Sequence, residues 1–103
     1  MALTLQVLYP SGAGTTFDHG YYLGTHMTIV ADCIGRHLKD TLITRGVSGG
    51  ADQPAGYHAV ATLIFAEQDA MDAALAEIGP AVADIANFYD GQPHILLGEI
   101  IET

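Results

Sequence analysis

The chain has 103 residues, half of them hydrophobic, and a formal net charge of −9 at pH 7. This length fits one domain over residues 1–103, with enough apolar side chains for a core. The three basic residues, Arg36, Lys39 and Arg45, lie close together, and nine carboxylates but no Lys or Arg follow them. Nucleic acids and anionic membrane surfaces are bound by groups of cations, so we expect neither as a partner.

The prediction of a cellular compartment rests on three features that the sequence lacks. No apolar run approaches the roughly 20 residues of a membrane-spanning helix, and the N-terminus lacks the basic-then-apolar layout of a signal peptide. The single cysteine, Cys33, cannot form an internal disulfide, a bond typical of small secreted domains. We therefore expect a cytoplasmic protein in which Cys33 is a small hydrophobic residue of the core.

The first half of the chain predicts a strand, a helix and a second strand. Alternating side chains over residues 3–9 are typical of a half-buried strand. Residues 10–14 predict a turn, after which a threonine can cap a helix that ends near Gly35. The β-branched residues over 38–47 predict the second strand.

The second half predicts a loop, a strand, an interrupted helix and a last strand. Residues 48–56 are rich in Gly and Pro and predict the loop, and residues 57–65 predict the third strand. Helical spacing begins at Glu67, and one face then carries Met71, Leu75, Ile78, Val82, Ile85 and Tyr89. Gly79-Pro80 interrupts this face in phase, which predicts a kink or a short second helix. Residues 94–101 predict the last strand.

This order of elements, β-α-β-β-α-β, predicts an α+β ferredoxin-like fold: a four-stranded antiparallel sheet with both helices on one face. Several strands have apolar residues on both sides, as Val7 and Leu8 and residues 95–101 show. The helices can cover only one of those sides. A second copy packed face to face would cover the other, so we expect a homodimer through the open face of the sheet.

The first predicted helix places a histidine in an apolar stripe. At about 100° per residue, one face carries Tyr22, His26, Ile29, Val30 and Cys33. His26 is therefore expected to point inward, one turn from the hydroxyl of Tyr22. An imidazole in that position can change its charge near neutral pH.

The same region carries a family resemblance. The stretch Phe17-Asp18-x-x-Tyr21-Tyr22-x-x-x-His26 resembles the signature of the EthD family, named for ethyl tert-butyl ether degradation. Weaker matches along the whole chain are Leu8-Tyr9-Pro10, Phe65, Ala86-x-Phe88 and Gly98-Glu99-Ile100. Thr28 departs from the pattern because a proline is usual there, so we expect the helix to run more regularly through this point.

The resemblance implies a dimeric α+β barrel in which two ferredoxin-like sheets pack face to face. It also implies a pocket between each sheet and its first helix. The superfamily includes small enzymes that work without cofactors, such as lactone isomerases and quinone-forming monooxygenases, together with members that have no assigned chemistry. Fold alone does not determine which of these functions applies.

Each candidate site residue has a functional and a structural interpretation. His26 is our candidate general acid/base, with Tyr22 as its hydrogen-bonding partner, but a histidine bonded within the core gives the same pattern. His58 fits either a second acid/base group or a solvent-exposed histidine at a strand edge. Tyr9 and Phe65 end neighbouring strands and fit either a substrate-binding apolar pocket or ordinary core packing.

We expect no metal and no cofactor. No His-x-His, His-x-x-x-His or Cys-x-x-Cys spacing occurs, and the candidate ligands lie on separate elements. Haem, with His26 or His58 as axial ligand, is suggested only by the superfamily. As a nucleophile, Cys33 would need an activating base that the sequence does not identify.

Three functions stay open on the sequence. The first is a cofactor-independent isomerase, lyase or monooxygenase acting on a small apolar or aromatic metabolite. The second is a binding or accessory protein that holds such a metabolite for a separate oxygenase. The third is a dimeric module with no ligand, which a pocket too small for an organic molecule would favour.

Overall fold

The computed structural model describes residues 1–102. Its strands are β1 (Leu3–Pro10), β2 (Asp40–Arg45), β3 (Tyr57–Phe65) and β4 (His94–Glu99). Its α-helices are α1 (His19–Tyr21), α2 (Met27–Ile34), α3 (Gln68–Glu77) and α4 (Gly79–Asp84). A π-helical turn over Tyr22–His26 joins α1 to α2, and 3-10 turns follow α2 (Gly35–His37) and α4 (Ile85–Asn87).

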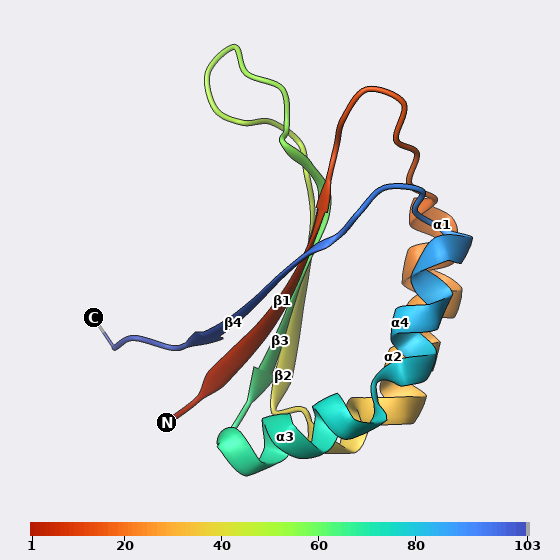
Figure 1. Ribbon diagram of the computed structural model, residues 1–103. Coiled ribbons are helices and arrows are strands. Elements are labelled where there is room, and N and C mark those ends of the chain that lie inside the picture. The colour runs from red at the N-terminus through yellow and green to blue at the C-terminus, as the bar shows by residue number, and fades with distance from the viewer. Residues whose placement is uncertain (103) are drawn as a thin grey trace.

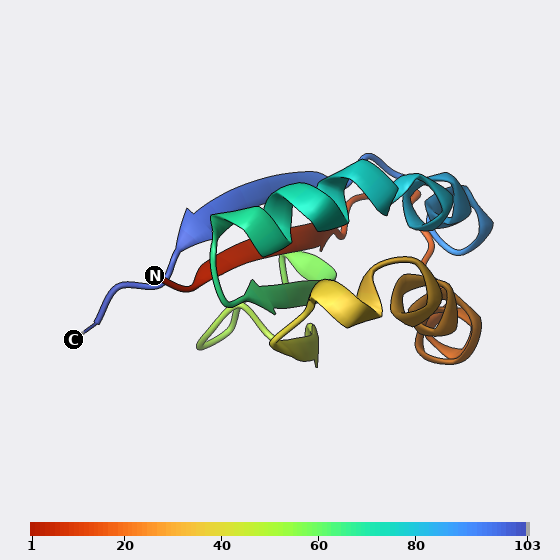
Figure 2. The ribbon, with the colours of Figure 1, turned by 90° about the horizontal axis from the view of Figure 1, so that it is seen from below.

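The four strands form one antiparallel sheet in the order β2-β3-β1-β4. Leu5 of β1 pairs with Leu63 of β3 on one side and with Leu97 of β4 on the other. All four helices lie on one face of this sheet (Figure 1), and α2 and α4 run beside each other (Figure 2). The predicted ferredoxin-like fold is therefore confirmed.

The space between the sheet and the helices contains two clusters of buried residues. One lies under α2 and α3 and consists of Leu5, Val30, Ile34, Leu63, Phe65, Met71, Ala74 and Ala81. The other is mainly aromatic and consists of Tyr9, Tyr22, Ala59, Phe88 and Tyr89. Cys33 packs against the first cluster and is partly buried.

The first helical segment is less regular than we expected. The backbone N–H of Met27 donates to the carbonyl of Tyr22, five residues back, which makes Tyr22–His26 a π turn. Thr28 lies just beyond this turn, in α2, and its hydroxyl donates to the carbonyl of Gly24 at 2.7 Å. The helix is regular at Thr28 itself, which lies within α2, and the irregular turn ends before it, at His26. π turns are rare and occur frequently at functional sites.

Gly79-Pro80 divides the second helical segment into α3 and α4, as predicted. Pro80 lies in the first turn of α4, where its missing N–H removes no helical hydrogen bond. The chain changes direction between these two helices, so that α3 lies below and α4 beside α2 in Figure 1. In residues 1–102 no helix has the length and apolar character needed to span a bilayer.

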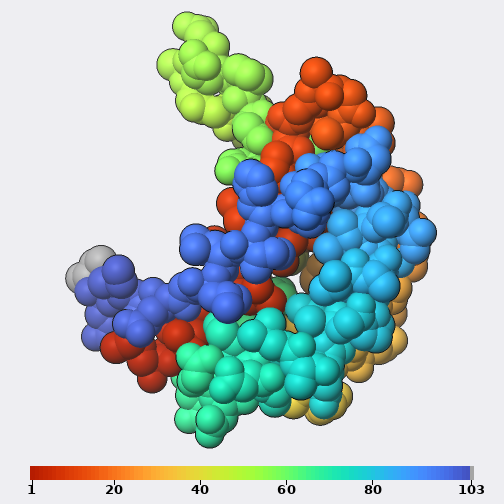
Figure 3. All heavy atoms as spheres, viewed as in Figure 1, coloured from red at the N-terminus to blue at the C-terminus, as the bar shows by residue number. Residues whose placement is uncertain are grey.

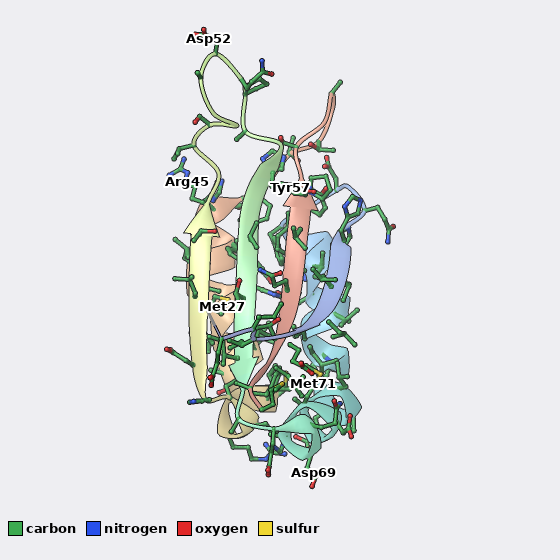
Figure 4. All side chains as sticks on the ribbon, turned by 90° about the vertical axis from the view of Figure 1, so that its left-hand side faces the viewer. Met27, Arg45, Asp52, Tyr57, Asp69 and Met71 are labelled. Atoms are coloured by element: carbon green, nitrogen blue, oxygen red, sulfur yellow. The ribbon has the colours of Figure 1, made fainter. Side chains whose placement is uncertain are left out.

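The other face of the sheet lies open, in front of the helices in Figure 4. Alternation along the strands puts five large apolar residues on it, namely Leu8, Leu42, Val60, Leu96 and the partly buried Ile64. The first and third are partly buried, whereas Leu42 and Leu96 are more than half exposed. An apolar sheet face of this kind is typical of an interaction surface.

Candidate functional site

A cavity of about 170 Å³ lies between the sheet and the helices. The sheet contributes Leu5, Val7, Tyr9, Ala61, Leu63 and Ile95 to its lining, and the helical side contributes Tyr22, His26, Met27, Val30, Leu75, Ile78, Ala81, Val82 and Ile85. An apolar cavity of about 150 Å³ holds a benzene molecule. This cavity is therefore large enough for a single six-membered ring.

His26 lies at the end of the π turn, and its ring lines this cavity. The residue is only 4% exposed. Its ring packs against those of Tyr22 and Phe88, with centroids 5.5 Å and 4.5 Å away. Its Nδ1 atom is 2.9 Å from Oδ2 of Asp84, the last residue of α4. Helices from the two halves of the chain therefore meet at this histidine.

Asp84 is held by three donors and is 7% exposed. Its Oδ1 accepts hydrogen bonds from the Tyr21 hydroxyl at 2.6 Å and from Nδ2 of Asn87 at 2.9 Å. Burial by itself raises the pKa of this carboxyl, but the hydrogen bonds from Tyr21, Asn87 and His26 outweigh it and hold the pKa below the ordinary value. Asp84 is therefore an ionised acceptor at neutral pH.

The charge on Asp84 determines the tautomer of His26. A carboxylate can only accept, so Nδ1 of His26 carries the hydrogen of the 2.9 Å contact. In the neutral ring Nε2 then has a free lone pair. Among residues 1–102 no group hydrogen-bonds to Nε2. An imidazole that a carboxylate orients and whose other nitrogen is free has the arrangement that general-base chemistry requires.

Two tyrosines supply the other polar atoms of the cavity lining. The Tyr22 hydroxyl is buried and has no hydrogen-bond partner in the described part of the chain. The expectation that it hydrogen-bonds to His26 was wrong, because the two rings stack and His26 bonds to Asp84 instead. Burial raises the pKa of Tyr22 to about 12. Burial also raises the pKa of Tyr9, and the neighbouring Tyr22 adds to that shift. Both groups are therefore neutral O–H donors at physiological pH.

His58 lies outside the cavity lining. Tyr9 pairs with Ala59 and Pro10 with Tyr57, so His58 is an extra residue in β3. This β-bulge turns its side chain to the helix side, where its Nε2 is 3.0 Å from Oγ1 of Thr15. His58 is neither the second acid/base group beside His26 nor a fully exposed histidine, because the bulge packs it at the rim of the aromatic cluster.

Phe65 also lies outside the cavity, in the core cluster under α3. The expectation that it joins Tyr9 in a pocket was wrong, because both residues end strands that run antiparallel. Tyr9 pairs with Ala59, whereas Phe65 pairs with Leu3 at the other end of the sheet. The strand advances by six residue steps from Ala59 to Phe65, which separates these two ends by roughly 20 Å.

The residues that sequence reasoning missed are Asp84 and its partners Tyr21 and Asn87. Asp84 follows the buried Ala81 by three residues and precedes the buried Phe88 by four, so helical spacing places it on the inner face. This spacing was the available signal. No signal in the sequence indicated that Asp84 pairs with His26, which lies 58 residues earlier in the chain.

No clustered ligand set for a metal occurs in residues 1–102: no three His, Cys, Asp or Glu side chains gather into a group that could hold an ion. The cavity is also far smaller than a haem macrocycle, which contains four pyrrole rings, so the residues around His26 do not fit that group.

The chain belongs to the EthD family, because the family model of the EthD domain matches residues 12–92. This match confirms the resemblance carried by the Tyr21-Tyr22 and His26 positions. No curated protein matches the chain.

Solved structures resemble it over nearly its whole length. An EthD-like protein from Ralstonia eutropha JMP134 is 28% identical, with 98% of this chain and 93% of that chain covered and a TM-score of 0.87. A dimeric ferredoxin-like protein of unknown function from Thermobifida fusca YX is 16% identical, with 97% and 92% covered and a TM-score of 0.67. SnoaB, a cofactor-independent oxygenase from Streptomyces nogalater, is 16% identical, with 99% and 95% covered and a TM-score of 0.63. At 16% identity the last two share the fold alone.

Proposed function

We propose that this EthD-family protein binds a small, mostly apolar organic molecule in the cavity and converts it with His26 as the acid/base group. One observation carries this proposal: Asp84 holds Nδ1 of a buried imidazole whose ring lines an apolar cavity. A histidine that served only to stabilise the core would not need a cavity beside it. Membership of the EthD family and the fold shared with a cofactor-independent oxygenase are consistent with this role.

The chemistry begins with a proton transfer. Nε2 of His26 takes a proton from a carbon next to a ligand carbonyl, and the C–H electron pair forms a C=C bond while the carbonyl pair moves to oxygen. The Tyr22 hydroxyl donates a hydrogen bond to that oxyanion, and Asp84 stabilises the imidazolium. Return of the proton to another carbon gives an isomer and restores His26. A lyase or an oxygenase would share the first of these steps.

Hydrogen–deuterium exchange tests this step without knowledge of the natural substrate. Thermal-shift screening of uncharged cyclic ketones and lactones first selects a molecule that binds. The exchange of hydrogens next to its carbonyl with D₂O is then followed by NMR, with the wild type and with His26→Gln. We expect faster exchange with the wild type alone. Equal exchange with both proteins would contradict the proposal.

A second candidate function is storage or delivery of an apolar metabolite for a separate oxygenase. It is favoured by the lining of the cavity, which is apolar except for one imidazole and two tyrosines. In that case His26→Gln retains ligand binding, and neither protein accelerates exchange or converts the ligand. Retained binding without wild-type turnover therefore separates this function from the enzymatic one.

We also propose that two copies pair through the open face of the sheet. The apolar residues on that face and the dimeric neighbour from Thermobifida fusca support this pairing. Sedimentation of Leu42→Glu tests it, because Leu42 is 58% exposed on the open face. We expect this variant to be monomeric, whereas Val47→Glu, in the exposed loop after β2, stays dimeric. A monomeric wild type would contradict the pairing.

The cytoplasm is the compartment that we propose for this protein. Its single cysteine, Cys33, is a free thiol packed against the core. The fold therefore needs no oxidising compartment for its assembly. Fractionation of cells that express the tagged chain tests this, and recovery outside the cytoplasm would contradict it.

A further inference from the structure

The cavity opens to solvent between β4 and the α3–α4 segment. Three lining residues lie at this mouth and are exposed: Leu75 of α3 by 39%, Val82 of α4 by 56% and Ile95 of β4 by 58%. Figure 3 shows the surface hollowed between β4 and α4. The mouth exists because β4 is an edge strand. The helices do not fully cover the side chains of β4 that lie on their side of the sheet.

The polar and apolar parts of the cavity lie on different elements. His26 and Tyr22 belong to the π turn and are buried, whereas the three mouth residues are apolar and partly in water. Apolar side chains that face solvent around a cavity are favourable places for further apolar ligand surface. A ligand would therefore place its polar atom deep in the cavity, at His26 and Tyr22, and its apolar atoms at the mouth.

Size and charge restrict the ligand further. The cavity of about 170 Å³ holds one ring, so any larger molecule has to extend through the mouth. The described part of the chain places no Lys, Arg, Asp or Glu in the lining. An ionic group on the ligand would therefore meet no permanently charged side chain there and would lose its hydration.

We propose that the ligand is an uncharged molecule with a ring and one oxygen at His26 and Tyr22, and with an alkyl chain that leaves across Leu75, Val82 and Ile95. The position of the ring rests on the proposed function. The alkyl chain rests on the mouth residues, which take no part in the proton transfer. The class of ligand is thus that of alkyl-substituted phenols or cyclic ketones.

Calorimetric titration with phenol and its para-ethyl, para-butyl and para-hexyl derivatives tests this proposal. We expect affinity for the wild type to rise by up to about fourfold for each methylene that covers the mouth residues. Ile95→Ser should lose most of the increase in affinity with chain length, when each derivative is compared with the affinity of the same variant for phenol.

Leu97→Ser is the matched control. Leu97 lies two residues further along β4, on the same side and 51% exposed, but it does not line the cavity. Its variant should keep the full dependence on chain length. The proposal would be overturned by an affinity that does not rise with chain length, or by equal losses in both variants. If phenol binds but affinity does not depend on chain length, only the proposed path of the alkyl chain is overturned. If no member of the series binds, the proposed ring site is contradicted as well.

Discussion

His26 and His58 both lie against aromatic rings on the helix side of the sheet, yet their surroundings differ. His26 is buried, hydrogen-bonds to a carboxylate and lines a cavity. His58 is partly exposed, contacts the hydroxyl of Thr15 and stacks on Phe17 at 5.5 Å, away from the cavity. A carboxylate partner and a place in the cavity lining therefore distinguish His26, the candidate acid/base group, from the packed His58.

The largest expected effect comes from exchanging these two histidines for glutamine in turn. His26→Gln removes the proton acceptor, so turnover of a bound ketone should fall by about 10²–10⁴-fold. His58→Gln should leave turnover within the error of the assay. The measurement is the deuterium-exchange rate, and a comparable loss in both variants would mean that the two sites do not differ in chemistry.

Asp84→Asn should have the next largest effect on turnover. It removes the charge that selects the Nδ1–H tautomer of His26, and we expect turnover to fall by about 10- to 100-fold, the effect of losing one charged hydrogen bond. The deuterium-exchange rates of the wild type and of Asp84→Asn check this, and equal rates would mean that the carboxylate does not act on His26.

The same substitution affects stability in acid. Because the pKa of Asp84 is lowered in the folded chain, its ionised form stabilises the fold above the ordinary pKa of 3.8. This contribution is lost as the pH falls through the lowered value. Urea unfolding should show a steeper loss of stability below about pH 4 in the wild type than in Asp84→Asn. Identical acid dependence would mean that the carboxylate is not stabilised by its partners.

Tyr22→Phe should change stability at alkaline pH. The buried phenol has a pKa of about 12, compared with 10.0 for a free one. Its neutral form therefore stabilises the fold below pH 10, and up to about 3 kcal/mol is lost as the pH rises from about 10 to 12. Tyr22→Phe should lose less over this range, as denaturant unfolding can measure. At pH 7 the variant should be at least as stable as the wild type, because its missing hydroxyl had no partner.

The smallest effect is expected at His58. Thr15→Val removes the contact with Nε2 of His58 and the hydrogen bonds between the Thr15 hydroxyl and Gly12. It should lower the free energy of unfolding by about 0.5–1.5 kcal/mol for each hydrogen bond lost. Turnover and ligand affinity should not change, since Thr15 is remote from the cavity lining. A loss of ligand binding in this variant would show that the two histidine regions are coupled.

Much of the fold could be predicted because periodicity is a local property of the chain. The alternation over residues 3–9 and the break at Gly79-Pro80 reappear in β1 and in the boundary between α3 and α4. The inward position of His26 was predicted for the same reason. Phe65 was wrongly predicted to line the cavity, because the alternation of residues along a strand determines which face of the sheet a side chain lies on but not at which end of the sheet it lies.

Local spacing of apolar and polar residues determined the order of the elements, the faces that they bury and the inward direction of the His26 ring. Only the tertiary structure decided that Asp84, 58 residues further along the chain, meets that ring, and that the Tyr22 hydroxyl is left without a partner. The contact between Asp84 and His26 depends on how α4 packs beside the π turn, and the position of His58 depends on one bulge in β3. Neither arrangement produces a repeating pattern of apolar and polar residues along the chain, so the sequence does not predict it.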